Sequence, residues 1–138
     1  MENTKVLGRA IAINTGGIYS SELKSGIHTM MVDEPAEFGG ENLGPSPIDL
    51  LCMSLASCKA ITLRMYSKRK DWNMTHVQVE VSFVRATQIA SGRNTFYCTL
   101  KLQGELDEAQ QTRLLEISKA CPVDRLLRKE SDVFTFVE

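Results

Sequence analysis

One long apolar stretch constrains the fold of this chain more than any other feature. Pro45 and Pro47 interrupt whatever precedes them, and a long helix-compatible run follows, apolar on nearly every side in its first half. Ser46 is a natural N-cap for that helix, and Asp49 falls in its first turn, where the helix dipole favours a negative charge. The pattern predicts a helix over residues 46–70. A helix that is apolar all round belongs in a core rather than on a surface.

The small size of the chain, together with this helix, predicts that the protein is oligomeric. At 138 residues the chain suits one domain with a real core. A helix of this length that is apolar all round is nevertheless hard to bury in so small a domain. Two copies that pack these helices together would cover them, so we expect a homodimer.

Charge and hydropathy exclude several classes of partner. The net charge is −1, from 16 basic and 17 acidic residues, which gives no electrostatic case for nucleic acid or an anionic membrane surface. No apolar run reaches the length of about 18 residues that a membrane-spanning helix needs. The first residues lack the basic and apolar regions of a signal peptide, so we expect a cytoplasmic protein with no membrane association.

Turn signals divide the first third of the chain into short strands. Residues rich in β-branched side chains at 4–14, 18–22 and 27–32 predict an antiparallel meander that occupies residues 1–32. Residues 33–47 contain several glycines and prolines and predict a long loop, of the kind that is usually functional or mobile.

The second half of the chain predicts a hairpin, two helices and a last strand. Strict alternation over 77–83 and 95–103 indicates two paired strands. Helices are expected over 107–119 and 123–128, and residues 133–137 predict a closing edge strand.

These elements together predict the fold class. Since no strand–helix–strand repeat occurs, a parallel sheet is not expected. The sequence therefore predicts an α+β fold in a single domain over residues 1–138, with the meander, the central helix, and a hairpin, helices and strand over 75–138.

The cysteines are the candidate chemical groups, and there are four of them: Cys52, Cys58, Cys98 and Cys121. Structural disulfides are rare in a reducing cytosol, and the spacing of cysteine and histidine does not fit a zinc site. We expect no metal and no other cofactor. Packing or redox chemistry remains, and we interpret Cys52 and Cys98 as packing residues.

Cys121 and Cys58 each have two interpretations. Pro122 places Cys121 at the N-cap of the last helix, where free N–H groups and the helix dipole stabilise a thiolate. The alternative is a cysteine that merely precedes a proline. Cys58 lies in mid-helix, where a buried cysteine is more often an inert small hydrophobe, unless it is a thiol held in a shielded pocket.

Three segments resemble the OsmC/Ohr family of thiol-dependent peroxide reductases. They are Thr15-Gly16-Gly17, Gly44-Pro45-Ser46-Pro47 followed along the same helix by Cys58, and Ala120-Cys121-Pro122-Val123. The resemblance covers essentially the whole chain. It implies antiparallel sheets wrapped around a long central helix in an intertwined homodimer.

The resemblance also implies a mechanism. Cys58 would be the peroxidatic thiol that reduces an organic or hydrogen peroxide, and Cys121 the resolving thiol that forms a disulfide with it. An external dithiol or a lipoyl-bearing protein would then reduce that disulfide. An apolar pocket around Cys58 would favour organic peroxides, because their alkyl chains gain from burial.

Two positions depart from the family pattern. In the organic-hydroperoxide branch an arginine follows the Thr-Gly-Gly turn and a glutamate precedes the first cysteine, and the two form a salt bridge that activates the thiol. Ile18 and Ile48 stand at these positions here. Asp49 is one residue away and is a second candidate for the pocket, although its place in the first helical turn also explains it.

The missing pair leaves the activating charge and the function open. Arg9, Lys24 and Lys59 are candidates for the cation that lowers the pKa of Cys58. Besides a peroxide reductase, the sequence is compatible with a redox sensor of the same fold that has little turnover. It is also compatible with a protein whose apolar cleft binds a hydrophobic ligand.

Overall fold

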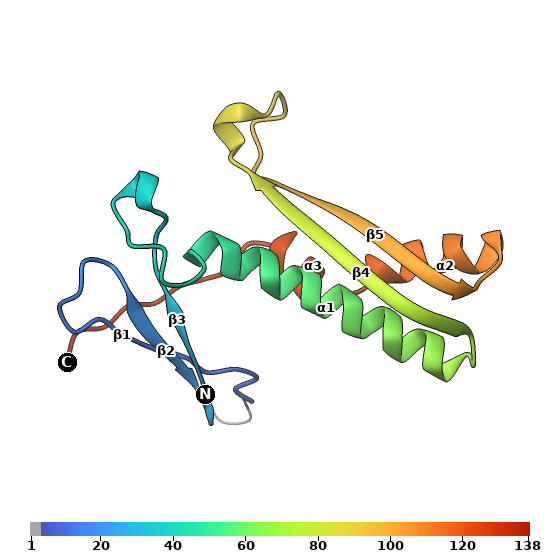
Figure 1. Cartoon of the computed structure of the whole chain (residues 1–138), viewed down its shortest axis with the longest axis horizontal. Helices are drawn as coiled ribbons and strands as arrows, with labels where there is room; N and C mark the ends of the chain where they lie inside the picture. Colours follow the sequence, from blue (N-terminus) through green and yellow to red (C-terminus); the bar gives the residue numbers. More distant parts are fainter. Residues whose placement is uncertain (1–3) are drawn as a thin grey trace. The chain divides into compact units, whose positions relative to one another are not determined.

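The computed structural model describes residues 4–138, and these form two compact units, one up to Leu50 and one from Leu51 onward. Each unit is described by itself. The chain combines antiparallel strands with a long helix (Figure 1), so the predicted α+β class is confirmed.

The first unit contains the predicted meander as a three-stranded antiparallel sheet with the order β1-β2-β3. Its elements are β1 (Ile11–Ile13), β2 (Ser21–Ser25), β3 (His28–Val32) and the short 3-10 helix η1 (Ala36–Phe38). The first strand is shorter than predicted, and the second starts at Ser21 rather than at Ile18. The side chain of Asn14 accounts for the shift, because it accepts the Gly16 N–H at 3.2 Å and donates to the Ser20 carbonyl at 3.3 Å.

The long loop before the central helix is ordered around Asp33. This side chain is 2% exposed, and its carboxylate accepts backbone N–H groups from Glu34 at 2.8 Å, Glu41 at 3.2 Å and Leu43 at 3.1 Å. Burial works to raise the pKa of Asp33, but these N–H groups hold it below its ordinary value. The Asp33 carboxylate therefore fixes the conformation of this loop, which is rich in glycine and proline.

The central helix α1 (Pro47–Arg69) matches the prediction within a residue at each end. A capping box starts it, in which Ser46 Oγ accepts the Asp49 N–H at 3.1 Å and Asp49 Oδ2 accepts the Ser46 N–H at 3.0 Å. Asp71, at φ 55°, is in the left-handed region just beyond the last turn, where a helix cannot continue.

The second unit carries a long hairpin and two helices. Its elements after α1 are β4 (Asn73–Val84), η2 (Ala86–Gln88), β5 (Thr95–Glu105), α2 (Glu108–Ser118) and α3 (Pro122–Leu127). The predicted hairpin and helices are confirmed, and β4 begins earlier than the alternation indicated. One side of the hairpin packs on α1 and α2 around a core of Leu63, Tyr66, Met74 and Leu114.

The closing strand predicted at residues 133–137 is not formed. The segment has no regular secondary structure, and Val133, Phe134 and Phe136 are 85%, 77% and 86% exposed. An alternating pattern becomes a strand only where a second strand supplies hydrogen bonds, and nothing in the described part of the chain pairs with this one.

Helix α1 is buried on one side only. The buried stripe consists of Leu55, Lys59, Leu63, Tyr66 and Ser67. Apolar residues elsewhere on the helix, such as Ile61 and Met65, are exposed in a single copy. The chain by itself does not enclose the helix, as expected for so small a domain, and that a second copy covers the rest stays a prediction. The buried stripe unexpectedly includes a lysine.

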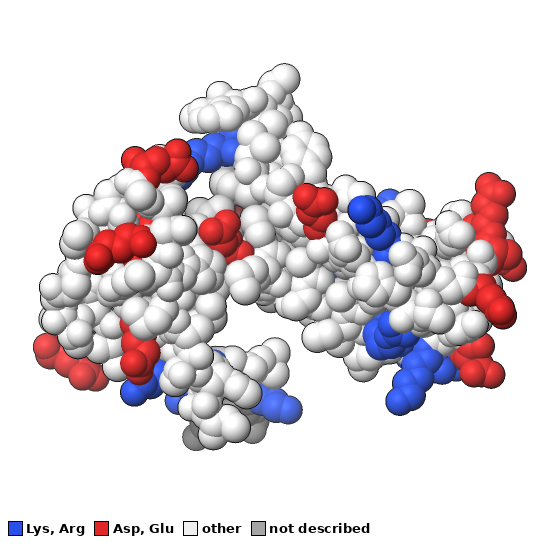
Figure 2. All heavy atoms as spheres, in the orientation of Figure 1, with Lys and Arg blue, Asp and Glu red and all other residues white. Residues whose placement is uncertain are grey.

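Acidic and basic side chains are interspersed with uncharged surface on the face that Figure 2 shows. Neither sign forms a continuous field there. This distribution agrees with the near-zero net charge of the chain.

The capping box predicts a structural effect of Asp49. Ser46→Ala and Asp49→Ala each remove one half of the box, and we expect each to lower the free energy of unfolding by about 1 kcal/mol. Urea unfolding followed by circular dichroism measures this change. Glu37→Ala, which removes an exposed carboxylate from the same unit, is the control and should have little effect. An Asp49→Ala variant as stable as the wild type would contradict the assignment.

Candidate functional site: a pair of unequal thiols

The structure brings together the two cysteines that the sequence singled out. Cys58 lies in the middle of α1, and Cys121 lies in the short connection between α2 and α3. Cys58 is near enough for its thiol to raise the pKa of Cys121. The site therefore contains two neighbouring thiols from segments far apart in the sequence.

Cys121 is the N-cap of α3, as predicted, and its Sγ accepts the Asp124 N–H at 3.3 Å. The expected stabilisation of a thiolate is outweighed, however. Cys121 is 0% exposed, and burial raises its pKa more than the Asp124 N–H and the charge of Lys59 lower it. Cys121 is therefore a protonated thiol at neutral pH.

The two thiols differ in their access to solvent. Cys58 is half-buried, whereas Cys121 is fully buried. A small reagent that diffuses to the pair meets Cys58 first. Access to a reagent from solvent is therefore greater at Cys58 than at Cys121.

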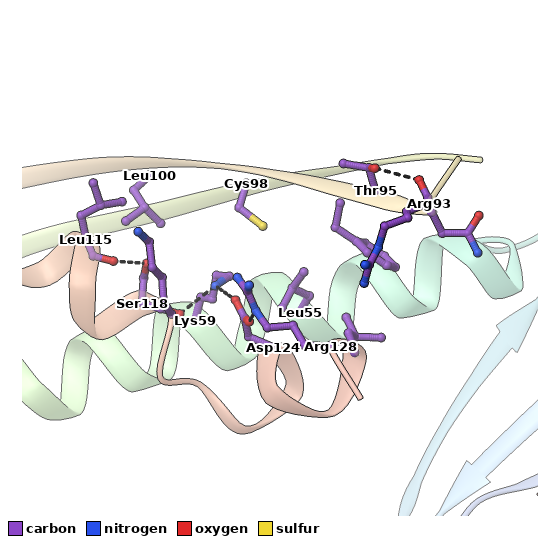
Figure 3. A pocket seen from close by; sticks show the side chains of 14 residues that line it. Leu55, Lys59, Arg93, Thr95, Cys98, Leu100, Leu115, Ser118, Asp124 and Arg128 are labelled. Carbon is purple, nitrogen blue, oxygen red and sulfur yellow. Dashed lines mark hydrogen bonds and ion pairs between the residues drawn. The ribbon is translucent and has the colours of Figure 1, made fainter. Parts of the chain in front are cut away.

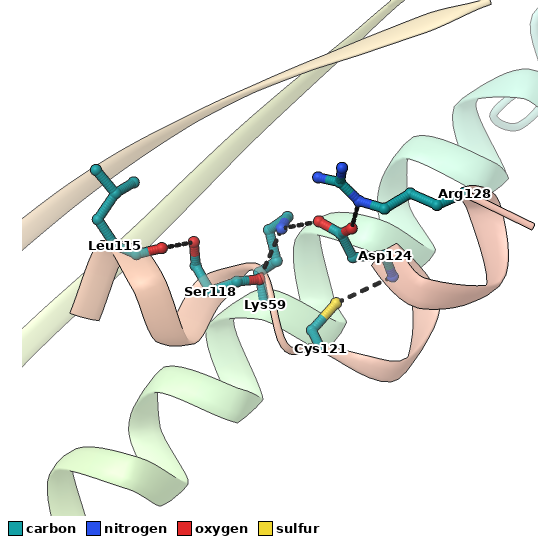
Figure 4. A network of polar contacts seen from close by, with 6 residues as sticks. All are labelled: Lys59, Leu115, Ser118, Cys121, Asp124 and Arg128. Carbon is teal, nitrogen blue, oxygen red and sulfur yellow. Dashed lines mark hydrogen bonds and ion pairs between the residues drawn. The ribbon is translucent and has the colours of Figure 1, made fainter. Parts of the chain in front are cut away.

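A buried ion pair lies beside Cys121 (Figure 4). The Lys59 ammonium, in a residue that is 3% exposed, donates to Asp124 Oδ2 at 2.6 Å and to the Ser118 carbonyl at 2.7 Å. Asp124 also accepts a hydrogen bond from Arg128. Burial opposes ionisation of Asp124, but Arg128 and Lys59 hold its pKa below the ordinary value.

The sequence did not single out Asp124, although two signals pointed to this pair. Lys59 lies at helical spacing between Leu55 and Leu63, so the sequence itself places a charge within an apolar stripe. Lysine is almost never fully buried without a partner. Asp124 lies in the first turn after Cys121-Pro122, where an acid is favoured. The tertiary contact between them has no signature in a single sequence.

A cavity of about 340 Å³ adjoins the ion pair on the side of the hairpin (Figure 3). Leucines from α1, α2, α3 and β5 line it together with Lys59, Arg93, Lys119 and Arg128, and neither Cys58 nor Cys121 is among its lining residues. Cys98 on β5 faces this cavity and is exposed, so its interpretation as a packing residue is wrong. Partial desolvation raises the pKa of Cys98 above its ordinary value.

The other predicted site positions lie in the first unit. Ile18 is 59% exposed in the turn after β1, and Ile48 is 38% exposed in the first turn of α1. Asp49 has the capping role described above. That these three positions contribute to a substrate pocket stays a prediction.

A comparison with protein-family models identifies the family of this chain. A family model described as OsmC-like protein matches residues 39–135. The chain therefore belongs to the OsmC-like protein family. A comparison with curated proteins finds no match.

Solved structures of the same fold include several family members. An OsmC like protein from Mycoplasma pneumoniae has a TM-score of 0.72 at 18% identity, covering 93% of this chain and 89% of that chain. An organic hydroperoxide resistance protein OsmC from Legionella pneumophila has a TM-score of 0.62 at 19% identity, covering 90% and 92%. The organic hydroperoxide resistance protein OhrB of Bacillus subtilis has a TM-score of 0.60 at 20% identity, covering 89% and 91%. At these identities the likeness shows the fold alone.

Within residues 4–138, no helix combines the length and the apolar character that crossing a bilayer requires. The cytoplasmic location expected from the sequence stays a prediction.

The raised pKa of Cys121 predicts a loss of stability at alkaline pH. Below the ordinary cysteine pKa of about 8.5, this thiol is protonated in both the folded and the unfolded chain. Above that value the unfolded chain releases its proton first, so the free energy of unfolding falls as the pH rises toward the folded pKa. Melting temperatures measured from pH 7 to 10 should therefore fall more steeply for the wild type than for Cys121→Ser. The serine keeps an N-cap acceptor but does not titrate in this range, and equal slopes would contradict the assignment.

Proposed function

We propose that this protein is a thiol-dependent hydroperoxide reductase in which Cys58 is the peroxidatic thiol and Cys121 the resolving thiol. The observation that carries the proposal is the neighbourhood of two thiols of unequal access, Cys58 half-buried and Cys121 fully buried. A peroxidatic thiol has to meet an external substrate, whereas a resolving thiol has to meet only its partner. Membership of the OsmC-like family supports the same division of roles.

The first step oxidises Cys58. Its thiolate attacks the O–O bond of the hydroperoxide, an S–O bond forms, and two electrons pass from sulfur to the peroxide. The released alkoxide takes up a proton and leaves as an alcohol, and Cys58 becomes a sulfenic acid. Only the thiolate is an effective nucleophile in this step.

The second step joins the two cysteines. The Cys121 sulfur attacks the Cys58 sulfenic sulfur, an S–S bond forms, and the hydroxyl group leaves with the Cys121 proton as water. An external dithiol, of the lipoyl type or a small molecule, then reduces the disulfide by exchange and restores both thiols. The balance is one hydroperoxide and one dithiol consumed for each alcohol, water and external disulfide released.

Organic hydroperoxides are the substrate class that we favour. Two of the structural neighbours, from Legionella pneumophila and Bacillus subtilis, are described as organic hydroperoxide resistance proteins. Exposed apolar side chains of α1 lie on the same helix as Cys58, Ile61 and Met65 among them. Their contact with an alkyl chain stabilises an organic peroxide by about 25 cal/mol per Å² of apolar surface removed from water.

A redox sensor or a hydrophobic-ligand-binding protein is the second candidate. The isoleucines at positions 18 and 48 leave the thiol without the charged pair of the organic-hydroperoxide branch, which favours slow oxidation without efficient turnover. The partly apolar cavity beside Lys59 favours ligand binding.

Thiol counting after peroxide treatment tests the proposal. With less than one equivalent of cumene hydroperoxide, the wild type should lose two thiols for each peroxide reduced and yield a Cys58–Cys121 link in peptide mass spectra. Dihydrolipoamide should restore both thiols and support repeated turnover. Cys58→Ser should reduce peroxide only at the background rate, whereas Cys98→Ser, the matched control with an exposed thiol, should retain the wild-type rate.

Three results separate the candidates. A Cys58→Ser variant with wild-type peroxide consumption would overturn the mechanism. Formation of the disulfide once, without turnover in the presence of dihydrolipoamide, would identify a sensor. Absence of thiol loss, together with a lipophilic molecule that copurifies, would identify a binding protein.

We also propose that the protein acts as a homodimer. Leu51, Ile61 and Met65 are 43%, 59% and 65% exposed, and they recur along α1 at the spacing of one helix face, on which Cys58 also lies. A second copy packed on this face would cover much of these side chains and leave an apolar pocket at Cys58 that an alkyl hydroperoxide can enter.

Sedimentation equilibrium tests the dimer. We expect a particle of twice the chain mass of 15.4 kDa, and we expect Ile61→Glu to shift it toward the monomer because a buried charge opposes association. Lys101→Glu, an exposed change on β5, should leave the dimer intact. A wild-type mass of one chain at micromolar concentration would rule the dimer out.

A further inference from the structure

Lys59 follows Cys58 directly on α1 and reaches two points on either side of Cys121. Its ammonium donates to the carbonyl of Ser118, the last residue of α2, and to the carboxylate of Asp124, in the first turn of α3. One side chain thus ties both ends of the connection that carries Cys121 to the helix that carries Cys58 (Figure 4).

Each of these contacts suits an ammonium group. The carbonyls at a helix C-terminus lack intrahelical partners and lie at the negative end of the helix dipole, so Ser118 offers a favourable acceptor. Asp124 is 8% exposed and needs a cationic partner to stay ionised. Its own N–H donates to Cys121 Sγ. The ammonium, the carboxylate and the Cys121 sulfur therefore form one connected chain of contacts.

Stability alone does not account for a lysine at this position. Leu55 and Leu63 precede and follow Lys59 in the buried stripe of α1, and a leucine there would pack without any desolvation penalty. Apolar replacements of buried ion pairs are often as stable as the pair or more so. What an ion pair with short, directed hydrogen bonds supplies, and a leucine does not, is a defined position of the connected segments.

We propose that Lys59 is a positioning residue for the resolving step, which holds the Cys121 connection against α1 beside Cys58. This inference rests on the proposed function for its role in turnover, but the geometric claim stands on the contacts alone. We call the two hydrogen bonds from Lys59 to Ser118 and Asp124 the clamp. The clamp lets Cys121 react with the Cys58 sulfenic acid before a second hydroperoxide does. A second hydroperoxide would transfer an oxygen to the sulfenic sulfur, leave as alcohol, and produce a sulfinic acid that thiols do not reduce.

The charge of Lys59 acts in the same direction. It lowers the pKa of Cys121 against the effect of burial, which increases the fraction of attacking thiolate. The other groups that influence this region are Cys58 on α1, Cys98 on β5, Asp124 on α3, and Arg128 at the C-cap of α3. Asp124 offsets part of the lysine charge.

The test compares Lys59→Met with Lys119→Met, a matched loss of one lysine that is exposed and lines the same cavity. Lys59→Met leaves Asp124 with fewer cationic partners, so the double variant Lys59→Met/Asp124→Leu is included to remove the buried charge as well. Circular dichroism and thermal melting establish that each variant is folded.

The first measurement uses no peroxide. Equilibration with reduced and oxidised dithiothreitol gives the effective concentration of Cys121 at Cys58, and we expect it to fall about tenfold in both Lys59 variants and to stay unchanged in Lys119→Met. If the effective concentration of Cys121 at Cys58 is unchanged in folded Lys59→Met/Asp124→Leu, Lys59 is not a positioning residue. This arm is independent of peroxidase activity.

The second measurement follows the fate of the sulfenic acid. After one equivalent of cumene hydroperoxide, we expect the Lys59 variants to show more dimedone adduct and more sulfinic acid at Cys58 for each hydroperoxide consumed. Lys59→Arg, which keeps a cation, should restore part of the disulfide yield. If the Lys59 variants have a lower effective concentration of Cys121 at Cys58 but the wild type reduces no peroxide, the positioning role of Lys59 stands and the proposed function is rejected. If the wild type turns over peroxide and the Lys59 variants have the wild-type effective concentration, the proposed function stands and the positioning role is rejected.

Discussion

The geometry around the thiols depends on one buried ammonium. Lys59 contacts the last residue of α2 and the first turn of α3, so its hydrogen bonds connect three helices at one point. Asp124 extends the connection to Cys121 through its backbone N–H and to Arg128 through its carboxylate. Removing either Lys59 or Asp124 alone lowers the stability of the fold, because the other charge then remains buried without its partner.

The two thiols draw different properties from these surroundings. Burial raises the pKa of Cys121 and keeps its thiol protonated, so it reacts slowly with oxidants from solvent. Cys58 is open enough to be reached. A lysine and an aspartate, brought together from α1 and α3, form a buried ion pair next to Cys121.

Local features were predictable from the sequence, and tertiary ones were not. The N-cap at Ser46, the N-cap at Cys121 and the hairpin strands depend on neighbours within a few residues, and all of them occur in the structure. The Lys59–Asp124 contact joins positions 65 residues apart, and no spacing rule reaches that far. Cys98 was misjudged because alternation shows which face a strand residue takes, but not whether another element covers that face.

The exposed end of the chain has a consequence for handling the protein. Residues 133–137 alternate like a strand, carry large apolar side chains and have no strand partner in the described chain. Such a segment adds to open sheet edges through backbone hydrogen bonds, with little dependence on the partner's side chains. In an isolated chain, residues 133–137 are therefore a site where association with another sheet edge is favoured.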